Sequence, residues 1–166
     1  MRTIRKWLAA ALFLSCAFSF LVWSPSQAQT PPDSDIAVVA HPDMPVNEMS
    51  LDEVRRVFLG ERQYWNAKLP VVLLILAPVA RERDVVLRVI YQMTETQFKQ
   101  YWIAKIFRAE TASAPKIVYS NDVEYNLVTA LPGAIGFMDA RDAARAKLKV
   151  VRVDGLLPGD RGYPLH

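Results

Sequence analysis

The sequence predicts an α/β layered domain, with a central mixed sheet and helices on both faces. Apolar runs suited to buried strands alternate along the chain with segments whose apolar residues recur at helical spacing. The continuous apolar run from Leu69 to Leu76 suits a strand that is covered on both faces. Such a strand needs a layer of helices on either side.

The first 28 residues read as a cleavable secretory signal peptide. Arg2, Arg5 and Lys6 precede an almost wholly apolar stretch from Trp7 to Trp23, and Ser26-Gln27-Ala28 offers small residues at the cleavage position. The alternative is an uncleaved membrane anchor. The apolar stretch is shorter than the roughly 20 residues that a spanning helix needs, which favours cleavage.

Removal of this segment changes the chemistry expected of the chain. Cys16 is the only cysteine, its surroundings do not match a lipid-attachment site, and residues 29–166 therefore have no disulfide and no thiol chemistry. The segment holds three of the 20 lysines and arginines and none of the 17 acidic residues. Residues 29–166 thus carry 17 charges of each sign, and nucleic acid is not an expected partner.

The 138 residues that follow position 28 (166 − 28) are enough for one domain. We expect a polar leader over residues 29–35, the α/β domain over residues 36–153 and a glycine- and proline-containing tail over residues 154–166. The first strand is Ile36 to Ala40, ended by a turn at Pro42.

Two capping boxes mark helix starts. Ser50 and Glu53 open a helix that Gly60 ends, and Thr94 and Gln97 open a helix that runs through Phe107. Between them we expect a polar connection over residues 61–68, the strand over residues 69–76 and a helix over residues 81–93. The second capped helix is expected to bury its stripe of Phe98, Tyr101, Trp102 and Ile106.

The C-terminal part continues the alternation. It predicts a short strand at residues 116–119, a helix capped by Ser120 or Asn121, a helix capped by Asp139 and a strand over residues 148–153. Between the two helices, Pro132 and Gly133 stop the first one, and residues 134–138 form a buried strand. A glycine inside that strand, Gly136, indicates that a neighbouring element comes close there.

No motif of a catalytic or metal site is found. His41 and His166 are the only histidines, neither has a partner at ligand spacing, and the chain has no nucleophile elbow, Walker loop or dinucleotide fingerprint. We therefore expect no enzymatic activity, no metal and no cofactor.

Anion binding is the chemistry that the sequence leaves open. In α/β sheets, ligands lie beyond the carboxyl ends of strands, where helices begin. Two such junctions offer donors: Arg81 and Arg83 after one strand, and Ser120 and Asn121 after the next. The alternatives are a solvated helix face for the arginines, whose charge Glu82 and Asp84 offset, and ordinary helix capping for Ser120 and Asn121.

Ordered pieces of the chain resemble the substrate-binding proteins of ABC-type phosphate importers and their smaller periplasmic relatives. The resemblance extends over most of residues 29–166 as short pieces in the family's order: Ile36-Ala37-Val38-Val39, His41-Pro42-Asp43, Pro45-Val46, Met49 to Val54, Val57 to Glu61, Trp65, Tyr101-Trp102, Phe107 and Leu131 to Phe137. The resemblance implies the type II periplasmic binding fold, of which this length supplies one lobe.

The resemblance implies a periplasmic solute-binding protein that takes a small anion such as phosphate and acts with a membrane transporter or a sensor protein. A homodimer is left open, because a second copy would supply a second lobe. The family places a Ser-Gly-Thr helix start where this chain has Ala77 to Arg83. That departure supports an alternative, an interaction or sensory adaptor that keeps the fold and has lost the phosphate site.

Overall fold

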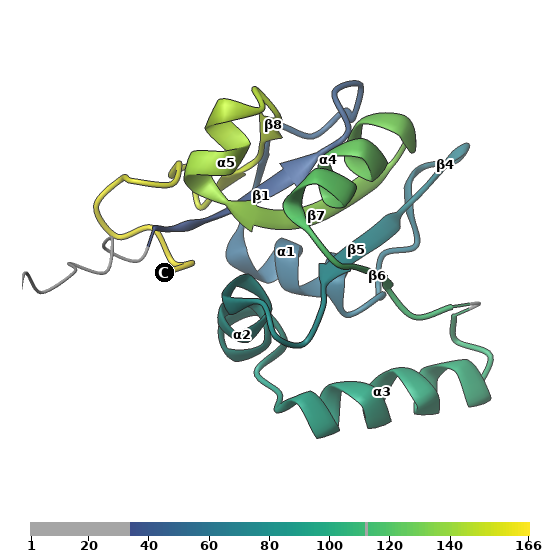
Figure 1. The fold of residues 1–166 in the computed structure, drawn as a ribbon. Helices are drawn as coiled ribbons and strands as arrows, with labels where there is room; N and C mark the ends of the chain where they lie inside the picture. The colour runs from purple at the N-terminus through teal and green to yellow at the C-terminus, as the bar shows by residue number, and fades with distance from the viewer. Residues whose placement is uncertain (1–33, 112) are drawn as a thin grey trace, which may run out of the picture. The chain divides into compact units, whose positions relative to one another are not determined.

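The computed structural model describes residues 34–111 and 113–166 as one α/β domain (Figure 1). The predicted signal peptide and most of the predicted leader lie outside these residues. The strands are β1 (Ile36–Ala40), β2 (Glu48–Met49), β3 (Tyr64–Asn66), β4 (Leu69–Pro70), β5 (Val72–Leu76), β6 (Lys116–Val118), β7 (Ala134–Asp139), β8 (Lys149–Val150) and β9 (Arg152–Val153). The helices are α1 (Leu51–Phe58), α2 (Arg81–Val86), the π-helix η1 (Leu87–Tyr91), α3 (Glu95–Phe107), α4 (Asn121–Ala130) and α5 (Ala140–Arg145).

The predicted mixed sheet is confirmed. Five strands pair in the order β6-β5-β7-β1-β8; β5 is parallel to β6 and β7, whereas β1 is antiparallel to β7 and β8. Two further pairs, β2 with β9 and β3 with β4, form small sheets of their own. Because β5, β6 and β7 run in one direction, their C-terminal ends meet at a single edge of the sheet. We call this the carboxyl edge.

The strand β1 shows why helices cover both faces. Ile36, Val38 and Ala40 belong to the larger hydrophobic cluster, which includes side chains of α1, η1 and α3. Ala37 and Val39 belong to the smaller cluster, with side chains of α4 and α5. Successive residues of a strand point to opposite faces, so both faces of β1 are buried.

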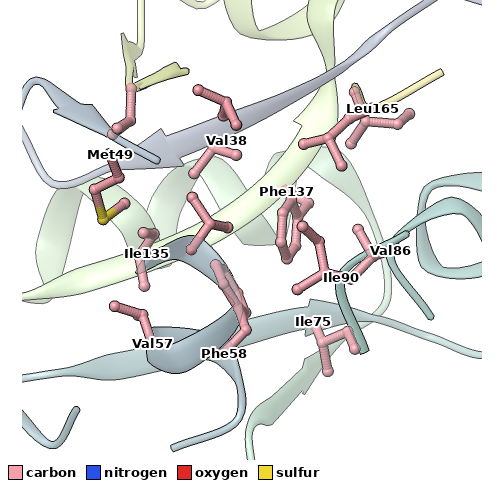
Figure 2. Close-up of a cluster of buried hydrophobic side chains, with 14 of the residues drawn as sticks. Val38, Met49, Val57, Phe58, Ile75, Val86, Ile90, Ile135, Phe137 and Leu165 are labelled. Carbon is pink, nitrogen blue, oxygen red and sulfur yellow. The ribbon is translucent and has the colours of Figure 1, made fainter. Parts of the chain in front are cut away.

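The larger cluster lies between the sheet and the helices α1, α2 and η1 (Figure 2). Phe98 and Trp102 of α3 also belong to it. Phe58 and Phe137 are its centre, with ring centroids 4.1 Å apart. Tyr91 approaches Phe58 edge-on, and Phe98 in turn approaches Tyr91 edge-on. Aromatic pairs of this geometry add to the free energy that burial of the rings contributes.

Both predicted capping boxes are confirmed. The Ser50 side chain accepts from the N–H of Glu53, and the Glu53 carboxylate accepts from the N–H of Ser50. Thr94 and Gln97 make the same reciprocal pair at the start of α3. Both helices therefore begin where the sequence predicts, because each cap depends only on residues three positions apart.

Several element boundaries differ from the prediction. The run predicted as one strand is divided at Val71 into β4 and β5, because Pro70 has no N–H to donate to a continuous ladder. β4 folds back instead onto β3, which lies in the predicted polar connection. The helix predicted to reach Met93 ends at Tyr91, because the next residue, Gln92, adopts a left-handed conformation (φ 54°). The strand predicted over residues 148–153 is also divided, into β8 and β9.

The predicted buried stripe of α3 is correct only in part. Phe98 and Trp102 are buried and Tyr101 is half-buried, but Ile106 is exposed.

The segment expected to be a tail also contributes to the core, since Tyr163 and Leu165 are buried in the larger cluster. The Leu165 carbonyl accepts from the N–H of Ile36, and the Tyr163 hydroxyl donates to the Ile36 carbonyl. Residues 163–165 are thereby fixed to the start of β1.

Candidate functional site

The carboxyl edge is where the sequence predicts the site. Parallel pairing brings the ends of β5, β6 and β7 together, so the loops that lead into α2, α4 and α5 begin there. The start of β1 lies at the same edge, because β1 is antiparallel to β7 and Ile36 pairs with Asp139. Among the predicted residues, this edge collects Arg81, Ser120 and Asn121.

Arg83 is a structural residue of the fold. Its side chain is 1% exposed, its Nε and one terminal nitrogen donate to the two carboxylate oxygens of Glu95 at 2.8 and 3.0 Å, and its other terminal nitrogen donates to the Leu76 carbonyl at 2.8 Å. The guanidinium also lies over the Phe98 ring, 4.9 Å from its centroid. These contacts join β5, α2 and α3, and an anion would have to displace Glu95 to reach Arg83.

The electrostatics of this pair fit a fixed ion pair. The hydrogen bond from Arg83 is the main cause that lowers the pKa of Glu95 below its ordinary value, with desolvation opposing it. Bidentate arginine–carboxylate pairs are among the stronger polar interactions in proteins, so the pair holds the start of α3 against the end of β5.

Arg81 lies at the carboxyl edge and is partly exposed. One of its terminal nitrogens donates to the carbonyl of Ser34, and the hydroxyl of Ser34 donates to the carboxylate of Asp139. Desolvation acts to raise the pKa of Asp139, but hydrogen bonds from Ser34 and Arg141 outweigh it, and the net shift is downward. Arg81 therefore stands beside an ionised carboxylate rather than in an isolated positive site.

The structure decides which residue caps α4. Ser120 is the N-cap, and its hydroxyl accepts from the N–H of Val123 at 3.3 Å. Asn121 is the first helical residue, and its side-chain amide donates to Asp142 at 2.7 Å. As at any helix start, the first N–H groups have no partner within the helix. The N–H groups of Asn121 and Asp122 therefore face the carboxyl edge or the solvent.

A pocket of about 330 Å³ lies beside this helix start, between α4 and α5. Asn121, Met138, Asp142 and Arg145 are among its lining residues. Arg145 pairs with Asp142 at 3.1 Å, and Asp122 adds a second carboxylate to the lining. The pocket thus has one cation for two carboxylates, which is unfavourable for an anion as highly charged as phosphate.

Glu124, which stands at capping-box spacing after Asn121, does not cap α4, because Ser120 is the N-cap. It is fully buried beside β7, its Oε1 accepts from the N–H of Phe137 at 2.8 Å, and its Oε2 has no hydrogen-bond partner among the described residues. Burial raises the pKa of Glu124 to about 8, although the hydrogen bond from Phe137 lowers it and the charge of Glu82 raises it further. At neutral pH the group is mostly protonated and adds little negative charge to the edge.

Exposed apolar side chains also lie at the carboxyl edge. Val79 is 96% exposed in the loop between β5 and α2, and Tyr119 is 81% exposed directly after β6. Val123, on the first turn of α4, is also exposed. We call these three residues the apolar rim. Exposed apolar side chains that gather at one place are typical of interaction sites.

The comparison with solved structures identifies the fold. PstS from Borrelia burgdorferi matches with a TM-score of 0.61 and 12% identity over 80% of this chain and 54% of its own. A phosphate transport receptor of ABC type from Vibrio cholerae matches with a TM-score of 0.59 and 15% identity, over 75% of this chain and 48% of its own. A Clostridium perfringens protein solved with bound phosphate, and assigned as a phosphate ABC transporter substrate-binding protein, matches with a TM-score of 0.55 and 17% identity. The match covers 74% of this chain and 46% of that protein.

The chain has the fold of phosphate ABC transporter substrate-binding proteins. This confirms the resemblance found in the sequence. The chain spans about half the length of these three proteins. No protein-family model and no curated protein sequence matches it.

Two further findings concern the described residues only. None of the helices in residues 34–111 and 113–166 is long and apolar enough to cross a membrane. Within the same ranges, no group of three or more histidine, cysteine and acidic side chains is arranged to hold a metal ion.

Proposed function

We propose that this chain is a periplasmic solute-binding protein of the phosphate-transport fold whose carboxyl edge forms one half of a binding cleft. In this proposal the edge contacts a small anion such as phosphate, and a protein partner, a membrane transporter or a sensor protein, covers the other side. The observation that carries the proposal is that the same edge of the sheet holds hydrogen-bond donors, at Arg81 and at the start of α4, together with the exposed side chains of the apolar rim.

The donors available for an anion are few. Arg81 supplies a charged group, and the start of α4 supplies the N–H groups of Asn121 and Asp122, which lie at the positive end of a ten-residue helix. Arg83 is committed to Glu95, and Glu82 and Asp122 flank the donors with negative charge. The edge alone therefore supports weak anion binding, and tight binding requires further donors from the partner.

The apolar rim supports contact with a protein partner. Val79 and Tyr119 are exposed and lie outside the described hydrophobic clusters, so their side chains are accessible to a partner. Exposed apolar side chains that lie close together are typical of interaction sites.

The second candidate is an interaction or sensory adaptor that binds no anion. The ion pair between Arg83 and Glu95 favours it, because the charge of this buried arginine near the edge is already neutralised. Both candidates are binding proteins, and neither assigns an enzymatic activity to the chain. They differ in whether the partner requires phosphate.

Calorimetry distinguishes the two candidates. The protein is expressed with its own N-terminal segment, purified, and titrated with inorganic phosphate as wild type, Arg81→Gln and, as a matched control, Arg88→Gln. Weak binding, with Kd near about 1 mM, that Arg81→Gln removes and Arg88→Gln keeps supports anion binding at the edge. Absence of binding in the wild type supports the adaptor.

Mass spectrometry of the same protein tests cleavage after Ala28 and with it the periplasmic location.

A further inference from the structure

A second pocket lies at the opposite, amino-terminal end of β5 and β6. It has a volume of about 240 Å³ and is formed by three segments that are far apart in the sequence: residues 60 and 62–64 after α1, residues 70–73 at the start of β5, and residues 111 and 113–116 before and at the start of β6. Trp102 of α3 also lines it. Nothing in the proposed function uses this pocket, and it shares no residue with the carboxyl edge.

The charged groups of this pocket have one sign. Arg62 and Lys116 are its charged lining residues, and no carboxylate is among the residues that line it. Arg62 is held in place, because its Nε and one terminal nitrogen donate to the carbonyls of Tyr64 and Trp65 and its guanidinium lies over the Trp65 ring. Lys116 is exposed, and no ion pair to it is found among the described residues.

Trp102, one of the residues that line the pocket, also carries an unused donor. Trp102 is 3% exposed, and its indole Nε1–H is buried without a hydrogen-bond partner among the described residues. An unpaired buried donor costs about 1–3 kcal/mol, and such groups call for an explanation. Thr111 and Ser113 add two hydroxyl groups to the lining, and Gln63 adds a side-chain amide that is bonded to the Glu110 carbonyl.

The remaining wall is apolar. Pro70, Val72, Leu73 and Pro115 line it together with the rings of Tyr64 and Trp102. The volume is below the roughly 300–1,000 Å³ of pockets for drug-sized ligands, so the occupant is small. Its chemistry follows from the wall: an anionic end for the cations and a short apolar body for the proline and aromatic side chains.

We infer that this pocket binds a small organic anion, a carboxylate or a phosphate monoester, through Lys116 and Arg62, with its apolar body against Trp102 and Pro70. The site is separate from the carboxyl edge, so it does not depend on the proposed function. Lys116 is the residue whose removal tests it best, since it is exposed and no hydrogen bond or ion pair to its side chain contributes to the described fold.

The test uses the full chain labelled with ¹⁵N, with benzoate and phenyl phosphate as probes and inorganic phosphate as the anion without an apolar body. The indole N–H signal of Trp102, assigned with Trp102→Phe, is followed during each titration. We expect both organic probes to shift this signal with a Kd of about 1 mM or lower, and inorganic phosphate to bind at least about threefold more weakly.

Lys116→Gln is compared with Lys68→Gln, which removes the same charge from an exposed lysine outside the pocket. We expect Lys116→Gln to weaken probe binding about tenfold, as loss of a charge-assisted hydrogen bond does, and Lys68→Gln to leave it unchanged. The inference is overturned if no probe shifts the Trp102 signal at about 10 mM, or if both lysine variants behave alike. An unchanged response in Arg81→Gln separates this result from binding at the carboxyl edge.

Discussion

Glu124 Oε1 accepts a hydrogen bond of 2.8 Å from the backbone N–H of Phe137, in the middle of the central sheet. The ladder between β5 and β7 pairs only Val72 with Ala134 and Leu73 with Ile135, although both strands continue beyond these pairs. A side chain of α4 thus satisfies a backbone donor of β7 that lies beyond that ladder. The same arrangement accounts for Gly136, because a Cβ there would lie 2.2 Å from Glu124 Oε1.

The raised pKa of Glu124 predicts that stability falls as pH rises. The folded state keeps the proton up to a pKa of about 8, whereas the unfolded state releases it near the ordinary value of 4.5. Between these two values the folded state binds more protons, so the free energy of unfolding decreases by up to about 1.4 kcal/mol per pH unit. Glu124→Gln keeps an acceptor for Phe137 and has no proton to release.

Urea unfolding of both proteins at pH 5.5, 6.5 and 7.5 measures this effect. Every other titratable group is common to the two proteins, so the difference between their free energies of unfolding isolates Glu124. We expect the wild type to lose stability relative to Glu124→Gln as pH rises. A difference that stays constant with pH would contradict a buried protonated Glu124.

Gly136→Ala tests the close approach of Glu124 to β7. The added methyl group overlaps Glu124 Oε1 and lies 3.2 Å from Leu74 Cβ, so we expect a loss of about 1–3 kcal/mol in the free energy of unfolding. In a Glu124→Ala background the same substitution should cost at least about 0.5 kcal/mol less, because the clashing oxygen is gone. Equal costs in both backgrounds would show that the carboxyl group does not fill this space.

Arg83 and Arg81 are predicted to differ in role although they are two residues apart. Arg83→Met removes the bonds to Glu95 and Leu76 and should lower the free energy of unfolding by about 2–3 kcal/mol. Arg81→Met should change it by less than about 1 kcal/mol, since that side chain is partly exposed. Thermal unfolding of the two variants measures both effects. A larger loss for Arg81→Met than for Arg83→Met would contradict the assignment.

The apolar rim is predicted to be unnecessary for folding. Tyr119→Ser should leave the free energy of unfolding within about 0.5 kcal/mol of the wild type, whereas Val118→Ser, one residue earlier and buried, should reduce it clearly.

We also expect the chain alone to sediment as a monomer, because three exposed side chains fall short of the roughly 800 Å² per partner that stable interfaces bury. A concentration-dependent dimer that Tyr119→Ser abolishes would instead make the rim a self-association surface.

The sequence was sufficient where structure depends on neighbouring residues. The capping boxes at Ser50 and Thr94 and the helix stop at Gly133 depend on contacts within a few positions, and all are present. Gly133 has φ 81°, and a Cβ there would lie 2.1 Å from the Pro70 carbonyl oxygen. The approach of an element to Gly136 was also predicted from the glycine alone.

The sequence was insufficient where a partner lies far along the chain. The Arg83 side chain donates to Glu95, at the start of α3, and to the carbonyl of Leu76. No local sequence pattern indicates these hydrogen bonds. Tyr163 and Leu165 are single apolar residues among glycines and prolines, so no periodicity marks them as core. The pocket with Lys116 and Trp102 brings together three separate segments and has no motif.

The proposal that the carboxyl edge binds a small anion is tested most directly by mapping inorganic phosphate on the backbone amide signals of the ¹⁵N-labelled protein. We expect the backbone amide signals of Asn121 and Asp122 and the side-chain signal of Arg81 to shift together. We also expect Arg81→Gln to reduce the shifts at the start of α4. Shifts confined to residues away from the edge, or none at about 10 mM phosphate, would contradict it.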